Sequence, residues 1–238
     1  MIASLLLSAA IWSAPAPQDC MPLEDTILLG IAKNTAGELL YCELVSQPQP
    51  KSLKISYVKD TIILAEKTLQ YTDNAKKPSI TQKDFRFGEL RQADIAEQEI
   101  KLQYQANKQQ KINSITLPIS QVDVIDAGFD SYIREEWNQL QAGKTLSVNF
   151  ASIPHLKTLP LRVSKQASEK CVHQESEITF CYLVEIDNAL LRLMLGKIKL
   201  TYNEQRRLRS FNGVVNILDE KQSTQSATIY YYYRQNRE

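Results

Sequence analysis

The sequence predicts an α+β fold that is mainly β, in which a curved antiparallel sheet, a half-barrel, wraps around one main helix. Polar and apolar residues alternate along most of the chain, one central segment has helical spacing, and no shift in composition divides the 238 residues. A sheet face and a helix stripe must each bury their apolar side, and one sheet curved around one helix satisfies both needs. We therefore expect a single domain over residues 20–238, with two small α+β domains as the alternative.

Period-two alternation predicts antiparallel strands that cover a core with one face and meet water with the other. Residues 53–58, LKISYV, place leucine, isoleucine and tyrosine on one face and polar residues on the other. Residues 178–186, ITFCYLVEI, are apolar on both faces, which is typical of a strand covered on both sides. Further strands are expected over residues 26–32, 61–69, 99–104, 146–150 and 198–202.

Helical spacing predicts the main helix over residues 126–142. Asp126 is a suitable N-cap, because its carboxylate can accept a hydrogen bond from a backbone N–H of the first turn. Gly143 is a suitable residue just beyond the helix, because glycine readily adopts the left-handed conformation found there. A second, short helix is expected over residues 188–195, ended by Gly196. Its apolar residues surround almost the whole helix, so it is either buried or bound to a partner.

The main helix places its apolar residues in one stripe: Phe129, Ile133, Trp137 and Leu140. Two large aromatic side chains in one stripe need a wide apolar surface to lie against. If the space between this stripe and the sheet is hollow, the four residues line a site for an acyl chain or another apolar ligand. If that space is filled, they form an ordinary core, which is the commoner arrangement of periodic apolar residues.

Residues 1–16 are predicted to be a signal peptide. Residues 2–12 form an apolar run, and Ala-Pro-Ala at residues 14–16 gives the small-x-small pattern of a cleavage site. The run is shorter than the ~20 residues that span a bilayer, so we expect no transmembrane span. No Lys or Arg precedes the run, and an N-terminal helix or strand packed on the domain is the alternative. We expect a periplasmic or secreted protein.

The four cysteines agree with export. An even number of cysteines in an exported chain predicts disulfides, here with three pairings to choose from. We favour Cys171–Cys181, because these residues flank a polar turn between extended segments, and closing such a short ring contributes about 2–3 kcal/mol. Cys20–Cys42 would then tie the mature N-terminus to the first strands. Four reduced cysteines in a cytosolic protein are the alternative.

The sequence contains few residues that indicate chemistry. His155 and His173 are its two histidines, and Cys171 lies two residues before His173, but no further ligand completes a zinc site. No nucleotide-binding loop and no G-x-S-x-G or H-E-x-x-H motif is present. We expect no catalytic residue, no metal and no cofactor. A Ser-His-Asp or Cys-His site assembled only in three dimensions is the least favoured alternative.

Basic residues gather in one short run, Arg206, Arg207 and Arg209. The run either contacts a phosphate or lipid headgroup, or belongs to a charged hairpin that protects a sheet edge. The net charge of +1 favours the hairpin and gives no reason to expect nucleic-acid binding.

Four consecutive tyrosines, Tyr230 to Tyr233, precede the end of the chain. A stacking platform would need its aromatic residues on one exposed face, but strand alternation places only two tyrosines on each face. Tyrosine is a favoured strand residue, so we expect the last strand of the sheet here.

The order of these elements resembles a known group of proteins. Strands precede the helical segment GFDSYIREEWNQLQAGK, and more strands lead to RRLRSFNGVVNILDE and a final strand. This order, with the arginine-rich turn, Phe211, Gly213 and Asn216, is similar to that of uncharacterised secreted proteobacterial proteins with a half-barrel fold like the LolA/LolB-like periplasmic lipoprotein carriers. The resemblance covers most of residues 24–234. It implies a half-barrel with an apolar cavity for acyl chains and no catalytic signature.

We therefore expect a non-enzymatic protein of the cell envelope. Its first hypothetical partner is a lipid or another apolar ligand in the concavity of the sheet. The alternative is a structural or protein-interaction module with a filled core, whose partner is an envelope protein. A hydrolase is the least favoured function.

Overall fold

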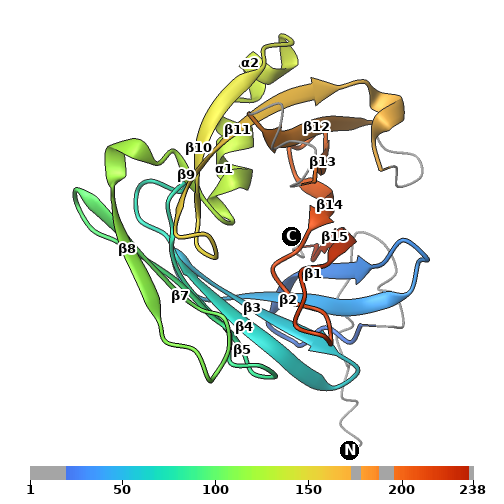
Figure 1. Cartoon of the computed structure of the whole chain (residues 1–238). Helices are drawn as coiled ribbons and strands as arrows, with labels where there is room; N and C mark the ends of the chain where they lie inside the picture. The colour runs from blue at the N-terminus through green and yellow to red at the C-terminus, as the bar shows by residue number, and fades with distance from the viewer. Residues whose placement is uncertain (1–19, 173–177, 188–195, 236–238) are drawn as a thin grey trace, which may run out of the picture.

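The computed structural model describes residues 20–172, 178–187 and 196–235, and fifteen strands within them form one curved, open sheet (Figure 1). The predicted fold class, mainly β with a half-barrel sheet, is confirmed. The first half of the chain forms β1 (Thr26–Lys33), β2 (Leu39–Gln49), β3 (Ser52–Lys59), β4 (Ile62–Gln70), β5 (Ser79–Asp84), β6 (Leu90–Ile95), β7 (Glu99–Gln105) and β8 (Asn113–Pro118). The second half forms β9 (Val124–Ile125), β10 (Leu146–Ser152), β11 (Lys157–Gln166), β12 (Thr179–Ile186), β13 (Ile198–Asn203), β14 (Leu208–Val214) and β15 (Ser226–Tyr233).

The last strand of the chain lies in the middle of the sheet. Strands β1 to β8 form one antiparallel meander and β10 to β14 form another, and β15 lies between β1 and β14 (Figure 1). Tyr231 pairs with Gly30 of β1, and Thr228 pairs with Asn212 of β14. The tyrosine run is therefore a strand, as predicted, and it joins the two halves of the chain.

The main helix is broken into two pieces. Helix α1 spans Gly128–Glu135 and α2 spans Trp137–Gln141, and α1 lies on the concave side of the sheet (Figure 1). The prediction of Asp126 as N-cap was wrong: Ala127 occupies that position without a side-chain hydrogen bond. Gly143 follows α2 with a φ of 83°, as expected for a glycine beyond a helix.

Other predictions fall on residues that the structure does not describe. The signal peptide over residues 1–16 and the short helix over residues 188–195 both lie outside the described residues. Neither of the two described α-helices has the length and hydrophobicity needed to cross a bilayer.

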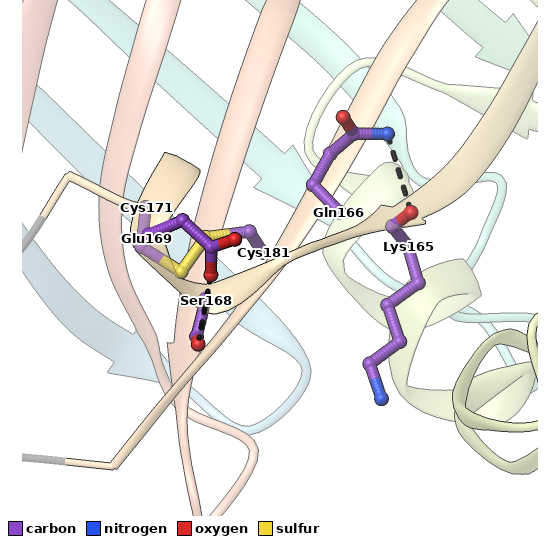
Figure 2. Close-up of a disulfide and its surroundings, with 6 residues drawn as sticks. All are labelled: Lys165, Gln166, Ser168, Glu169, Cys171 and Cys181. Carbon is purple, nitrogen blue, oxygen red and sulfur yellow. Dashed lines mark hydrogen bonds between the residues drawn. A yellow bond between two sulfur atoms is a disulfide. The ribbon is translucent and has the colours of Figure 1, made fainter.

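The structure contains both disulfides that the sequence favoured. Cys20–Cys42 joins the segment before β1 to β2, with 6.0 Å between the Cα atoms. Cys171–Cys181 joins the segment after β11 to β12, with 5.3 Å between the Cα atoms (Figure 2). Each bond restricts the unfolded chain and so favours the folded state.

Candidate functional site

The predicted apolar stripe packs against the strands of the second meander. Ile133 and Leu140 have no exposed surface, and Trp137 is 6% exposed. Phe129 is partly buried against the same cluster, which contains side chains of β10 to β13 and Val124 of β9. The structure therefore brings all four predicted residues together on one side of the sheet.

Aromatic rings surround Trp137. The centre of its ring lies 5.2 Å from that of Phe180, 5.4 Å from that of Tyr182 and 5.8 Å from that of Tyr202, in each case edge to face. This geometry is the favourable one for aromatic pairs. The guanidinium of Arg206 lies 5.3 Å from the ring centre of Trp137. Side chains of the protein itself thus occupy the space against the tryptophan.

A second group of residues, which sequence reasoning missed, consists of charged side chains and one asparagine that are buried or partly buried. We call it the interior ionic cluster, and its members are Glu43, Lys67, Glu89, Arg91, Asp126 and Asn216. They come from β2, β4, the start of β6, the segment after β9 and the segment after β14. Alternation places several of these charges on the apolar face of a strand, and a charge at such a position is the signal that could have revealed them.

Two ion pairs form the centre of the interior ionic cluster. The ammonium of Lys67 lies 2.7 Å from Oδ1 of Asp126, and Nη2 of Arg91 lies 2.8 Å from Oε1 of Glu89. Asn216 connects them, since its Nδ2 donates to Asp126 at 3.2 Å and its Oδ1 accepts from Arg91 at 3.1 Å. Buried charges need such partners, because an unpaired charge away from water is costly.

Asp126 has a structural role in this cluster. Its backbone has a φ of 43°, and its Oδ1 accepts the Ala127 N–H at 2.7 Å as well as the Lys67 ammonium. Burial alone would raise the pKa of Asp126, but Lys67 and these hydrogen bonds hold that pKa below its usual value. The carboxylate thereby anchors the chain at the entry to α1.

Glu43 differs from the other carboxylates because no described cation lies within ion-pair distance of it. Burial raises the pKa of Glu43 to about 7, although Lys67 and a hydrogen bond from the hydroxyl of Tyr231 oppose the rise. That hydroxyl donates to Oε2 of Glu43 at 3.2 Å. Asp126 adds to the rise, because it is a second negative charge nearby.

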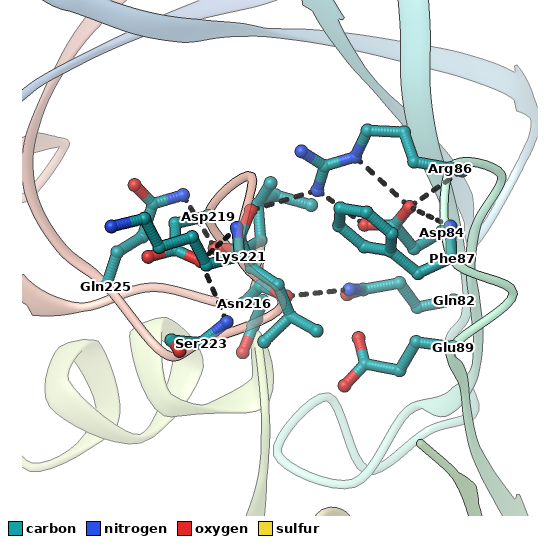
Figure 3. Close-up of polar contacts among 12 residues, drawn as sticks. Gln82, Asp84, Arg86, Phe87, Glu89, Asn216, Asp219, Lys221, Ser223 and Gln225 are labelled. Carbon is teal, nitrogen blue, oxygen red and sulfur yellow. Dashed lines mark hydrogen bonds and ion pairs between the residues drawn. The ribbon is translucent and has the colours of Figure 1, made fainter. Parts of the chain in front are cut away.

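Polar contacts also link β5 to the segment after β14. Nε2 of Gln82 donates to the backbone oxygen of Asn216 at 3.1 Å, and Arg86 donates to that of Leu218 at 2.9 Å (Figure 3). Arg86 also pairs with the buried Asp84 at 2.6 Å. These bonds hold the segment after β14 against the first meander.

One serine and one histidine lie in contact. Oγ of Ser152, the last residue of β10, is 2.7 Å from Nδ1 of His155 in the turn between β10 and β11. Burial, Lys157 and Arg91 lower the pKa of His155. No described carboxylate forms a hydrogen bond with His155, so the pair lacks the third member of a catalytic triad. His173 lies outside the described residues.

Arg206 and Arg207 lie in the turn between β13 and β14, and Arg209 lies in β14. Arg206 has a φ of 57°, and the guanidinium of Arg207 lies 5.3 Å from the ring centre of Tyr233. Nη1 of Arg209 donates to the backbone oxygen of Tyr231 at 3.2 Å. The hairpin was predicted correctly, but its role at a sheet edge was wrong, because both strands lie inside the sheet order.

A small cavity lies beside the Cys171–Cys181 disulfide. Its volume is about 250 Å³, and its lining includes Lys170, Lys197 and Lys199. Figure 2 shows this disulfide with the neighbouring ends of β11 and β12. The cavity does not include the residues of the predicted apolar stripe. Among the described residues, no group of three or more His, Cys, Asp or Glu side chains could hold a metal ion.

No protein-family model matches the sequence, and no curated protein matches it. Among solved structures, the chain is similar to a "Beta-barrel-like Protein of Domain of Unknown Function DUF1849" from Brucella abortus. The TM-score is 0.54 at 8% sequence identity, and the match covers 90% of this chain and 100% of that chain. The chain has a β-barrel-like fold. An identity this low shows the fold alone, and the resemblance to LolA/LolB-like carriers stays a prediction.

Proposed function

We propose that the chain is a non-enzymatic protein of the cell envelope that acts as a protein-interaction module with a filled core. The observation that supports this function best is the packing of the apolar stripe. Ile133, Trp137 and Leu140 are at most 6% exposed, and three aromatic rings surround Trp137. Hydrophobic burial explains this stripe without a ligand.

Location in the envelope rests on the predicted signal peptide and on the disulfides. Disulfides persist in oxidising compartments such as the periplasm and are rare in the cytosol. All four cysteines of the chain are paired, as Cys20–Cys42 and Cys171–Cys181. This pairing supports export.

A carrier of an apolar or acyl ligand is the second candidate function. The cavity beside Cys181 supports it, because three lysines and Leu183 contribute to the lining. Such a wall combines apolar surface with positive charge and suits the carboxylate or phosphate end of an amphipathic ligand. In a carrier of this kind the ligand would bind in the cavity beside Cys181, and not between the apolar stripe and the sheet.

Analysis of bound molecules separates the two functions. The full chain, including the predicted signal peptide, would be expressed in a Gram-negative host, purified from the periplasm, and studied by native mass spectrometry and by solvent extraction. We expect the mass of the disulfide-bonded polypeptide alone. A lipid recovered in stoichiometric amount would overturn the interaction-module proposal and favour the carrier.

A core variant provides the positive control. Leu140 is fully buried in the stripe, so Leu140→Ala creates an apolar cavity. Cavities of this kind bind small apolar molecules. We expect the variant, but not the natural chain, to bind an apolar probe such as benzene, which shows that the assay detects an empty site.

A further inference from the structure

The two edges of the open sheet differ in their protection. At one edge lies β9, which has two residues, both fully buried. The N–H of Ile125 donates to the backbone oxygen of Lys76 at 3.0 Å. The same oxygen lies 2.0 Å from the place where a Cβ on Gly128 would be, so the loop is pressed against the start of α1. This edge is short and covered.

The other edge, β8, is open. Its six residues, Asn113–Pro118, pair with β7 on one side, and no described residue outside β7 forms a hydrogen bond with the backbone of the strand. Ile115 is 37% exposed, and Ile112 just before the strand is 49% exposed. Figure 1 shows β8 at the outer border of the sheet.

Strand β8 lacks the usual protection of an open edge. Natural sheets protect such edges with charged side chains, bulges, very short strands or a covering segment. The sequence NSITLP contains no charge, and its pairing with β7 runs without a bulge. Proline occurs only at the final residue, Pro118. A strand with this composition is well suited to pair with another strand.

We propose that β8 pairs antiparallel with β8 of a second copy of the chain, in a register centred on Ile115. The inference names a partner for the proposed interaction module and rests on that function. The two-fold axis places Ile115 opposite the second copy's Ile115, and Ser114 opposite the second copy's Thr116. The pairing extends one sheet into the next.

Side-chain chemistry favours this self-pairing over pairing with an unrelated strand. Ile115 pairs with Leu102, which belongs to the core, so the two isoleucines would meet on the core face of the joined sheet. Ser114 and Thr116 are exposed on the other face, where serine and threonine form favourable cross-strand pairs. Since β8 has no charge, two copies meet without a like-charge pair.

In this register residues 113–117 of one copy pair with residues 117–113 of the other, which is a small interface. Small interfaces give weak and transient association, so we expect a dimer whose population rises with protein concentration. Sedimentation equilibrium over a wide concentration range is the suitable measurement. The predicted result is a reversible monomer–dimer equilibrium of the full, disulfide-bonded chain.

Two matched double variants test the register. In Ser114→Glu/Thr116→Glu, the register places like charges opposite each other twice across the interface. In Ser114→Lys/Thr116→Glu, the same positions carry opposite charges. Both variants carry Thr116→Glu, so any contact of the new carboxylate with Lys101 of β7 is the same in both. The variants differ only at residue 114, which is exposed.

We expect the dimer dissociation constant of the Glu/Glu variant to exceed that of the Lys/Glu variant by about tenfold at low salt. The difference should shrink as salt is added, because exposed charges are screened. Circular dichroism checks that both variants fold. A natural chain that stays monomeric, equal dissociation constants in the two variants, or loss of the dimer in both would each overturn the self-pairing. A ligand-free monomer overturns only the pairing, whereas a bound lipid overturns the proposed function.

Discussion

The stability of the folded protein should decrease as the pH rises from about 5 to about 7, and Glu43 should be the cause. This residue of β2 is 8% exposed, and its hydrogen-bond partner is the hydroxyl of Tyr231 at 3.2 Å. The buried cation that lowers the pKa of Glu43, Lys67, already pairs with Asp126 at 2.7 Å. Ionised Glu43 would therefore be a buried charge without a cation of its own.

The size of the effect follows from the pKa of Glu43. Burial raises it from 4.5 to about 7. Each pH unit of difference between the folded and unfolded pKa corresponds to about 1.4 kcal/mol, so the whole change is on the order of 3 kcal/mol. Between the two values the folded chain holds a proton that the unfolded chain has released. The stabilisation is full below the unfolded pKa and is lost as the pH rises through the folded pKa.

Urea unfolding of the natural chain and of Glu43→Gln, from pH 5 to pH 8, measures this change. Glutamine keeps the shape and an acceptor for Tyr231 but does not titrate. We expect the variant to lose the decrease in unfolding free energy and to be the more stable protein at pH 8. A decrease that persists in Glu43→Gln would refute the reasoning. His155 cannot explain the decrease, because its lowered pKa makes stability rise with pH.

Three further substitutions test the packing. Gly128→Ala should lower the unfolding free energy by about 1–3 kcal/mol, because the new Cβ would lie 2.0 Å from a backbone oxygen; an unchanged urea midpoint would contradict this. Cys171→Ala/Cys181→Ala should lower the unfolding free energy by about 2–3 kcal/mol, because the disulfide no longer restricts the unfolded chain. Thermal unfolding under non-reducing conditions measures this loss, and equal melting temperatures for the variant and the natural chain would contradict it. Lys67→Met should lower the unfolding free energy, measured by calorimetry, by about 3–5 kcal/mol, because it leaves the carboxylate of Asp126 without its cation. A smaller loss would mean that this carboxylate accepts a proton instead.

The strands and the apolar stripe were predictable because local patterns determine them. Residues 53–58 alternate in the sequence and form the middle of β3, and 146–150 likewise form most of β10. The stripe from Phe129 to Leu140 keeps one side toward the core, although Glu136 interrupts the helix. Period two and period 3.6 are properties of neighbouring residues, so they can be recognised without knowledge of the fold.

The interior ionic cluster was not predictable in the same way. Glu43 shares a strand face with Tyr41 and Val45, and Lys67 shares one with Ala65 and Leu69. The sequence pattern therefore shows a charge on an apolar face, but it does not show which residue pairs with that charge. The role of both residues depends on Asp126, which is distant in the sequence: Lys67 forms an ion pair with it, and its negative charge raises the pKa of Glu43. The same contact explains the wrong N-cap prediction. A carboxylate that pairs with a buried lysine from β4 is held by tertiary structure, and local capping preference does not decide its position.

The central position of β15 links the fold to the interior ionic cluster, because Tyr231 of this strand is the hydrogen-bond partner of Glu43. Its pairing with β1 joins the two ends of the chain, and contacts between such distant segments form slowly because a long loop must close first. Glu43 belongs to the first meander and Tyr231 to β15, and Asp126 lies between β9 and α1. Glu43 and Tyr231 can meet only after the last strand has paired with β1. The ion pairs Lys67–Asp126 and Arg91–Glu89 do not involve β15, but a chain that lacks β15 leaves Glu43 without its hydrogen-bond partner.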